Sequence, residues 1–480
     1  MSSSLIILLI ASYFGVLVLI SWLTSKKSGN DAFFKGNKQS PWYIVAFGMI
    51  GASLSGVTFI SVPGWVEASQ FSYMQVVLGY IVGYLVIGTV LLPLYYRLNL
   101  TSIYTYLEER FGNYSYKTGA SFFILSRIIG ASFRLFLVAN VLQLILFDDL
   151  GISFWQTVVI TVVLIWLYTF KSGIKTIVWT DTLQTLFMLI AVGVSIYYVS
   201  DALEISKGGI LNFVLESDLS KTFFFDDIKS GNYFWKQFIS GAFIAIVMTG
   251  LDQDMMQKNL TCKSLKDAQK NMFWFTIVLT VVNFIFLSLG LLLTVYAQKN
   301  GIDAHKDDLF PVLAKNHLGT TVFVCFLLGL IAAAYSSADS ALTSLTTSFS
   351  IDILDVEKKY DQEGQVKIRK KIHVLISIVL ILVIIAFKYL IKDESVIKSL
   401  FVFAGYTYGP LLGLYAYGLF TDWQVKDKLV PLICILAPVL SYIISTNSLK
   451  WFGFEFGFFV LILNGFLTFL GLVLIRTQKN

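Results

Sequence analysis

Long apolar segments, separated by short polar ones, follow one another along almost the whole chain. A helix needs about 20 residues of this kind to cross roughly 30 Å of hydrocarbon, and on that criterion we expect about thirteen transmembrane helices. They cover residues 5–23, 44–67, 73–95, 119–147, 154–170, 176–200, 234–257, 272–297, 319–355, 370–391, 395–421, 428–445 and 451–475. The segments are continuously apolar and do not alternate at every second residue, as the strands of a membrane barrel would. The pattern therefore predicts an all-α polytopic membrane protein.

Basic residues gather in every second loop between these segments. They are Lys26, Lys27, Lys35 and Lys38, then Arg97, Arg110 and Lys117, then Lys171 and Lys175, then Lys258, Lys263, Lys266 and Lys270, and last a run from 358 to 371. The other loops are acidic, among them the stretch 201–233. Because loops rich in lysine and arginine stay in the cytoplasm, we expect the N-terminus outside and the C-terminus inside a cell (inner) membrane. The first helix has neither a basic leader nor a small-residue cleavage site, so we expect it to be retained.

Composition narrows the function classes further. The chain is 56% hydrophobic and only 14% charged, which is far from the balance of a soluble domain. Its basic residues are scattered over short loops and form no domain-sized patch for nucleic acid. The three cysteines and three histidines have no metal-ligand spacing and offer no basis for metal or histidine catalysis. We therefore expect no enzyme, no appended soluble sensor domain and no obligatory protein partner.

One apolar segment, 319–355, carries a carboxylate and a row of hydroxyls. At 100° per residue the polar side chains fall on one helix face; they are Ser336, Asp339, Ser340, Thr343 and Thr347. Ionisable residues are costly inside a membrane and mark functional sites there, and convergent hard oxygens suit a cation. The alternative is that the hydroxyls bond back to their own helix and that Asp339 pairs with a basic residue. Since this helix carries no lysine or arginine near Asp339, the pattern favours a cation site.

Two segments contain signs of a broken helix. Residues 48–64 are rich in glycine and hydroxyls and include Pro63, and the segment 234–257 has a similar stretch at 248–254. Irregular backbone at bilayer depth is tolerated where it lines a cavity or binds something. The alternative for the first stretch is close helix packing through small residues. The two segments are five helices apart, as an inverted five-plus-five repeat around a midplane site would require.

These residues also resemble a known family. The string Trp179-Thr180-Asp181-Thr182-Leu183-Gln184-Thr185, the pair Asp252-Gln253 and the pair Ser336-Ser337 are similar to motifs of the sodium/solute symporter family, near its sialic-acid branch. The resemblance implies a leucine-transporter-type fold that couples inward sodium flow to solute uptake. It also implies one transporter domain over 1–480, with an extra N-terminal helix at 5–23, repeats at 44–200 and 234–421, and extra C-terminal helices at 428–475.

The resemblance further implies two sodium sites. The first takes carbonyls and hydroxyls from two helices, here at Gly51, Leu54, Ala333, Ser336 and Ser337, and oxygen-only ligation suits a hard cation.

The second sodium site, by the same resemblance, combines Asp181 with Ser336, Asp339 and Ser340. Asp339 departs from the family pattern, which has serine there. Two neighbouring carboxylates could instead share a proton, so proton coupling stays open as an alternative.

The solute is predicted from an arginine. Arg134 lies near the centre of the helix 119–147, where its guanidinium suits capture of a carboxylate, whereas Arg127 lies nearer the helix end and can snorkel or pair structurally. The alternative for Arg134 is pairing with an intramembrane acid. The resemblance adds Ser53, Ser55, Thr58 and Gln75 as solute contacts. We therefore expect an alternating-access sodium symporter that imports a small carboxylate-bearing solute; the alternatives are a neutral sugar or amino acid, proton coupling, or a non-transport membrane sensor.

Overall fold

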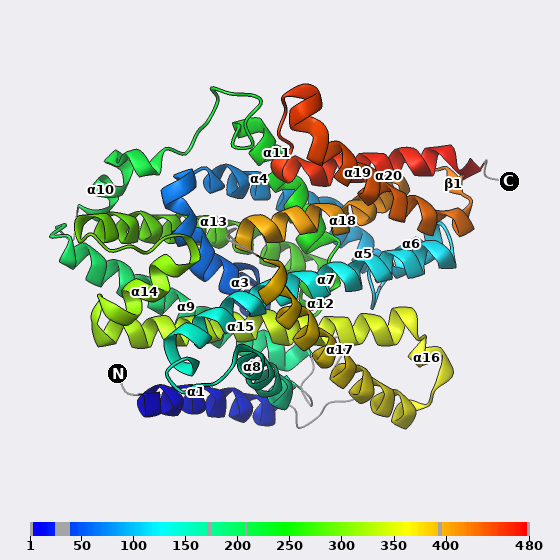
Figure 1. Ribbon diagram of the computed structural model, residues 1–480. Helices are drawn as coiled ribbons and strands as arrows, with labels where there is room; N and C mark the ends of the chain where they lie inside the picture. The colour runs from blue at the N-terminus through cyan, green and yellow to red at the C-terminus, as the bar shows by residue number, and fades with distance from the viewer. Residues whose placement is uncertain (1–2, 25–38, 170–173, 207–208, 392–395, 478–480) are drawn as a thin grey trace.

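The computed structural model describes residues 3–24, 39–169, 174–206, 209–391 and 396–477. Within them it is built from helices and one two-stranded sheet (Figure 1). The helices are α1 (Ser3–Thr24), α3 (Trp42–Ser69), α4 (Tyr73–Val86), α5 (Leu92–Arg97), α6 (Thr105–Arg110), α7 (Asn113–Leu142), α8 (Phe154–Thr169), α9 (Ile174–Ala202), α10 (Ile210–Glu216), α11 (Phe234–Ala245), α12 (Gln253–Asn259), α13 (Leu265–Lys299), α14 (Leu309–Asn316), α15 (Gly319–Ser348), α16 (Val356–Lys359), α17 (Gln362–Leu390), α18 (Val396–Phe420), α19 (Val430–Phe452) and α20 (Val460–Leu474). The strands β1 (Gln424–Val425) and β2 (Arg476–Thr477) pair antiparallel. The prediction of an all-α polytopic membrane protein is confirmed.

Ten of the described helical segments are long and apolar enough to cross a membrane. An eleventh is a bent pair, Phe234–Gly250 with Gln253–Asn259, whose two parts meet at 69°. Helices also lie at the two remaining predicted ranges, as the shorter α8 and as α18. The count of thirteen spans stays a prediction.

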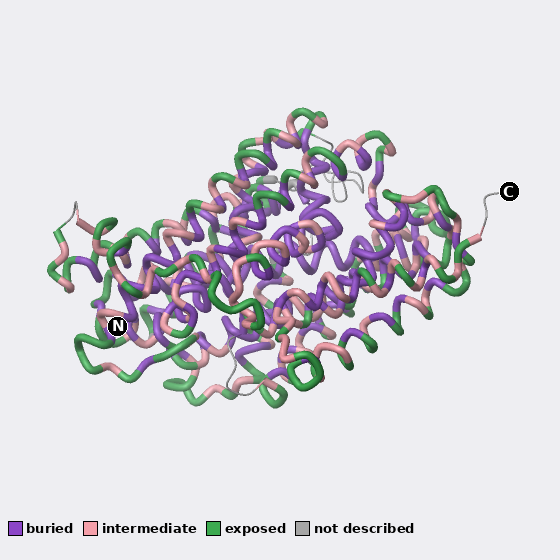
Figure 2. Tube along the Cα trace, turned by 90° about the horizontal axis from the view of Figure 1, so that it is seen from above, coloured by how far each residue is buried: buried purple, intermediate pink, exposed green. Residues whose placement is uncertain are grey.

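Burial separates central helices from peripheral ones. In the most apolar window of each span, 83% of the residues of α3 and 78% of those of α15 are buried, against 22% for α1 and for α19. Seen from above, buried residues fill the middle of the molecule and exposed ones line its outside (Figure 2). Because many exposed side chains of the outer helices are leucine, isoleucine and valine, these helices present the surface expected to face lipid.

The predicted interruption of the second segment is confirmed. Ser55, inside α3, has φ 41° and ψ 172°, so the helix is kinked there. A serine at positive φ is uncommon and is held only where its surroundings fix it. The carbonyls in the turn before such a break lose their usual intrahelical partners, which makes them available to a ligand.

The second break, between α11 and α12, is confirmed as well. Asp252 caps α12 by accepting hydrogen bonds from the amides of Asp254 and Met255. The carbonyls on the other side of the break are bound by tyrosine hydroxyls, at 2.8 Å from Tyr95 to Gly250 and 2.9 Å from Tyr104 to Leu251. All of these groups are buried, so these two carbonyls and two amides are satisfied inside the protein.

The two central helices are joined through α9, which packs closely against both α3 and α15. The approach of α3 to α9 depends on Gly51, because a β-carbon there would overlap the hydroxyl of Thr185. Helix α7 packs against α15 and α3 as well, and it also contacts α17 and α18. The break in α3 is therefore enclosed by helices from both halves of the chain.

Candidate functional site

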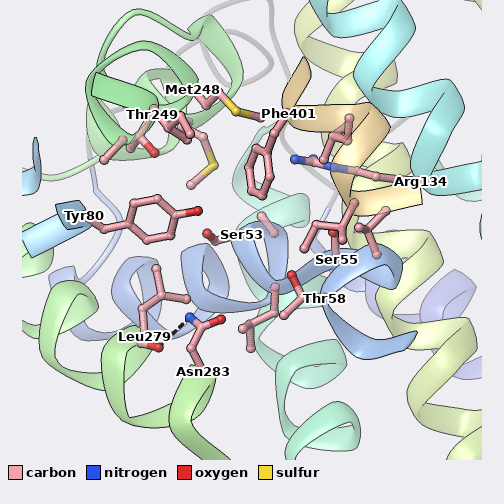
Figure 3. Close-up of a pocket in the computed structure, with 18 of the residues that line it drawn as sticks. Ser53, Ser55, Thr58, Tyr80, Arg134, Met248, Thr249, Leu279, Asn283 and Phe401 are labelled. Carbon is pink, nitrogen blue, oxygen red and sulfur yellow. Dashed lines mark hydrogen bonds between the residues drawn. The ribbon is translucent and has the colours of Figure 1, made fainter. Parts of the chain in front are cut away.

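A small pocket lies at the break in α3 (Figure 3). Its cavity measures about 60 Å³, which leaves room for only a few water molecules. Helices α3, α4, α7, α11, α13 and α18 contribute to its wall. Ser53, Ser55, Thr58 and Arg134, four of the five predicted solute contacts, line this pocket.

Arg134 is the charged group of this pocket that no acid neutralises directly. Its side chain comes from α7, and Figure 3 shows the guanidinium turned toward the pocket beside Phe401. Arg134 is 8% exposed and makes no hydrogen bond or ion pair with any described residue; its buried Nε has no partner. The alternative of pairing with an intramembrane acid is therefore not the arrangement in this structure.

Arg127, one heptad earlier on α7, is held quite differently. Its guanidinium forms an ion pair and a hydrogen bond with Asp254 on α12, and it lies 3.8 Å from Asp252. Asp252 in turn accepts a hydrogen bond of 2.6 Å from the hydroxyl of Tyr408 on α18. Arg127 also lines the pocket, but its charge is already compensated. The expectation of structural pairing for this residue is met.

Gln75, the fifth predicted solute contact, does not line the pocket. Its amide nitrogen donates to the carbonyl of Asn232 and to Oε1 of Gln237, both at 3.0 Å. Its amide oxygen accepts from the backbone of Phe224 at 3.2 Å. Gln75 thus joins α4 to α11 and to the segment before it, and both hydrogens of its amide nitrogen are used in this arrangement.

Several pocket residues were missed by sequence reasoning. Asn283 of α13 lines the pocket together with Tyr80, Tyr84, Thr249 and Phe401. Figure 3 shows Asn283 near Thr58, with its amide nitrogen donating to the carbonyl of Leu279 at 2.8 Å. A signal for Asn283 existed, because it is a lone amide in the apolar run 272–297. The tyrosines carried none, since the chain has 24 of them.

A second polar cluster lies where α15 meets α9. The hydroxyl of Ser336 donates to Oδ1 of Asp181 at 2.7 Å, and both side chains are fully buried. The ammonium of Lys258 donates to Oδ2 of the same carboxylate at 2.6 Å. The loop position predicted for Lys258 is therefore wrong: it belongs to α12 and is 1% exposed. Although α15 itself carries no basic residue near this cluster, Lys258 reaches the cluster from another helix, α12.

Two hydroxyls of the predicted polar face of α15, and that of the neighbouring Ser337, have no partner among the described residues. The two are those of Ser340 and Thr343, and all three hydroxyls are buried. Thr347 behaves as the structural alternative predicts and bonds back to the carbonyl of Thr343 at 2.8 Å. Oδ1 of Asp339 accepts from the backbone amide of Ser340 at 2.5 Å. Buried hydroxyls without partners are costly, so this face is suited to an additional ligand.

The residues predicted for the first sodium site lie on two helices that pack against each other. Gly51 and Leu54 occupy the turn before the break in α3, and Ala333, Ser336 and Ser337 occupy the middle of α15. All five are buried. The hydroxyl of Ser336 is bound to Asp181, whereas that of Ser337 has no partner in the segments that the structure describes.

Known proteins resemble this chain along nearly its full length. A sodium/sialic acid symporter (NanT) from Aliivibrio fischeri is 24% identical over 476 residues, which cover 95% of this chain and 91% of that protein. A sodium/sialic acid symporter (SiaT) from Proteus mirabilis is 23% identical, covering 88% and 87%. The human sodium-coupled monocarboxylate transporter 2 is 22% identical, covering 85% and 67%.

Solved structures define the fold. The substrate-bound, outward-open structure of a sodium-coupled sialic acid symporter aligns with a TM-score of 0.82 at 20% identity, over 99% of each chain. The closed structure of Mhp1, a nucleobase-cation-symport-1 family transporter, aligns with a TM-score of 0.56 at 13% identity, over 94% and 95%. The protein thus has the leucine-transporter-like fold that these transporters share.

The family model "Sodium:solute symporter family" matches residues 33–422, which include both helix breaks, the pocket and the cluster around Asp181. It also spans the strings around Asp181, Asp252 and Ser336 on which the predicted resemblance rested. The chain therefore belongs to the sodium:solute symporter family and is a multi-pass, sodium-coupled transporter of a solute.

Proposed function

We propose that this symporter imports a small organic solute that carries a carboxylate, in the manner of a sialic-acid transporter. The observation that supports the proposal most is the guanidinium of Arg134, which is buried in the pocket wall without an acidic partner in the part of the chain that the structure describes. An uncompensated cation at bilayer depth is costly, and a carboxylate that pairs with its planar fork would offset that cost through charge-assisted hydrogen bonds. The relatives named for sialic acid and for monocarboxylates are consistent with an anionic solute.

The remaining pocket groups suit the rest of such a solute. Hydroxyls of Ser53, Ser55 and Thr58 lie along α3, and the amide of Asn283 on α13 lies near Thr58. A cavity of about 60 Å³ is too small for an organic acid with several hydroxyls, so binding requires the pocket to open. Closing over the solute and reopening to the other side is alternating access.

Sodium is the coupling ion in this proposal. The first site comprises carbonyls of Gly51 and Leu54 with Ala333, Ser336 and Ser337. It is supported by the broken backbone of α3 and by the Ser337 hydroxyl, which has no partner among the described residues. A second site around Asp181 would use Ser336, Asp339 and Ser340.

The proposed function also includes a membrane topology. We infer thirteen spans with the N-terminus outside, and a five-plus-five inverted repeat in which 44–200 and 234–421 are the two halves of a single transporter domain. The breaks in α3 and between α11 and α12 support this division because they lie in the first helix of each half. Helices 5–23 and 428–475 are then additions outside the repeat.

The test is uptake into proteoliposomes with and without an inward sodium gradient. A panel should contain sialic acid, short monocarboxylates, a neutral sugar and a neutral amino acid. We expect sodium-dependent uptake of a carboxylate, weakened most by Arg134→Ala and less by Arg134→Lys, which keeps the charge but loses the fork. Uptake that prefers a neutral solute and ignores Arg134→Ala would overturn the carboxylate assignment. Uptake that follows a proton gradient in sodium-free buffer would overturn sodium coupling.

A further inference from the structure

Lys258 places an ammonium group at the position where the proposed second sodium site needs its cation. The Lys258 side chain is 1% exposed and its Nζ lies 2.6 Å from Oδ2 of Asp181. The other oxygen of that carboxylate accepts from Ser336. Asp181 therefore already holds one positive charge, supplied by the protein itself.

The surroundings of this pair are richer in oxygen than an ammonium group uses. Ser340 and Thr343 lie one and two turns beyond Ser336 on α15, and their hydroxyls have no partner among the described residues. A sodium ion binds several oxygens at once, including hydroxyls. Helix α15 therefore carries hydroxyls without a partner among the described residues on the same face as Ser336, which binds the already paired carboxylate of Asp181.

Lys258 also has a second acidic group within reach. Asp254 lies four residues earlier on α12, so the two side chains share one face of that helix. Asp254 uses Oδ2 to bind Arg127, while its buried Oδ1 has no partner among the described residues. The ammonium can thus move from Asp181 to Asp254 without being left alone in the membrane interior, which would be costly.

We infer that Lys258 is a tethered cation that competes with sodium for the carboxylate of Asp181. When sodium binds to Asp181, Ser336 and Ser340, the ammonium moves to Asp254; when sodium leaves, it returns. Each exchange replaces one positive charge by another, so no proton has to be taken up or released. This inference rests on the proposed second sodium site.

The exchange would also change the ion pairing of an arginine in the solute pocket. Asp254 holds Arg127, which lines the pocket together with Arg134. An ammonium that arrives at Asp254 competes for the carboxylate that fixes Arg127. Two side chains of the short helix α12, Lys258 and Asp254, thereby link sodium binding at Asp181 to the arginines of the pocket.

The test measures binding of sodium alone, with no solute present, to the purified full-length protein. Binding of radioactive sodium is followed against choline chloride in the wild type, Lys258→Met, Lys258→Arg and the double variant Asp181→Asn/Lys258→Met. Lys258→Met removes the competitor, and we expect sodium to bind roughly tenfold more tightly, which corresponds to about 1.4 kcal/mol. Lys258→Arg keeps the charge and can grip the carboxylate with two hydrogen bonds, so sodium should bind several-fold more weakly. The double variant should lose the gain.

Unchanged or weaker sodium binding in Lys258→Met would overturn the inference, as would unchanged or tighter binding in Lys258→Arg. Failure of Lys258→Met to fold even in high sodium would also count against it, because sodium would then not replace the ammonium. In that case Lys258→Arg, which keeps the ion pair, still tests the inference by whether its sodium affinity falls below that of the wild type. A wild type that binds sodium but transports no carboxylate would refute the proposed solute and leave this comparison intact.

Discussion

Arg127 and Arg134 lie seven residues apart on one helix, but their contacts differ. From these contacts we expect removal of Arg127 to lower the stability of the fold and removal of Arg134 to leave it nearly unchanged. In Arg127→Met the carboxylates of Asp252 and Asp254 lose their cation while remaining buried, with side-chain exposures of 0% and 1%. Breaking a buried ion pair by removing one partner typically costs about 3 to 5 kcal/mol, because it leaves an uncompensated charge. In Arg134→Met no ion pair is broken, so the native fold should lose little.

Against a typical free energy of unfolding of about 5 to 15 kcal/mol, the loss of about 3 to 5 kcal/mol expected for Arg127→Met is about a fifth of the whole or more. The assay is thermal unfolding of purified protein in detergent, followed by monodispersity on size exclusion, with Arg134→Met as the matched control. We expect a clear loss of thermal stability only for Arg127→Met, and partial recovery when Asp254→Asn is added, because that change neutralises one stranded carboxylate.

Solute binding should show the converse pattern. Deleting the arginine of a buried carboxylate pair costs about 2 to 5 kcal/mol of binding free energy, or roughly 30-fold to several thousand-fold in affinity. Arg134→Met should show this loss in protein of nearly normal stability. Equal thermal stability of the Arg127→Met and Arg134→Met variants would refute the reasoning, since it rests on one arginine being paired and the other not.

Three further predictions concern single groups. Ser337→Ala should weaken sodium binding by up to about tenfold without unfolding the protein, since its hydroxyl has no partner within the described ranges. Ser195→Ala is the control that should leave sodium binding unchanged, because it removes a buried hydroxyl that bonds its own helix at 2.7 Å. His305, in the loop before α14, lies 2.8 Å from Glu67, and this contact raises the pKa of His305 above 6.5. The contact should therefore stabilise the protein fully below about pH 6.5 and lose its effect as the pH rises through the raised pKa. Thermal stability measured against pH should show this trend, and His305→Gln should abolish it. Gly51→Ala should destabilise the protein by about 1 to 3 kcal/mol, because its new β-carbon would meet α9; normal thermal stability and transport in this variant would show that the two helices can separate freely.

Much of the architecture could be predicted because a bilayer restricts the backbone to continuous apolar helices. The break in α3 was also predictable, since glycines, hydroxyls and Pro63 concentrate where a helix would otherwise run on, and the kink falls at Ser55. Arg134 was predictable for a similar reason: a lone charge at the centre of an apolar run has no route to water.

Lys258 and Gln75 were misjudged because their surroundings are set by contacts distant in sequence. Lys258 follows the second break, and a rule that assigns lysines to loops puts it in water. The 69° turn into α12 instead directs it to Asp181, 77 residues earlier in the chain. Gln75 lies on the helix next to the pocket, yet its amide is used by Gln237, 162 residues away. No local pattern reports such partners.

The position of α12 explains why so much charge is tolerated inside this membrane protein. This seven-residue helix lies among α3, α9 and α15 and reaches α7 through its Asp254 side chain (Figure 1). Its Asp254 pairs with Arg127, which lines the pocket at the break in α3, and its Lys258 pairs with Asp181 on α9. If these pairs served only stability, apolar side chains of similar volume would do as well or better. Buried charges that can exchange partners are instead suited to a helix whose two ends must respond to each other, and that is the requirement that ion-coupled transport imposes.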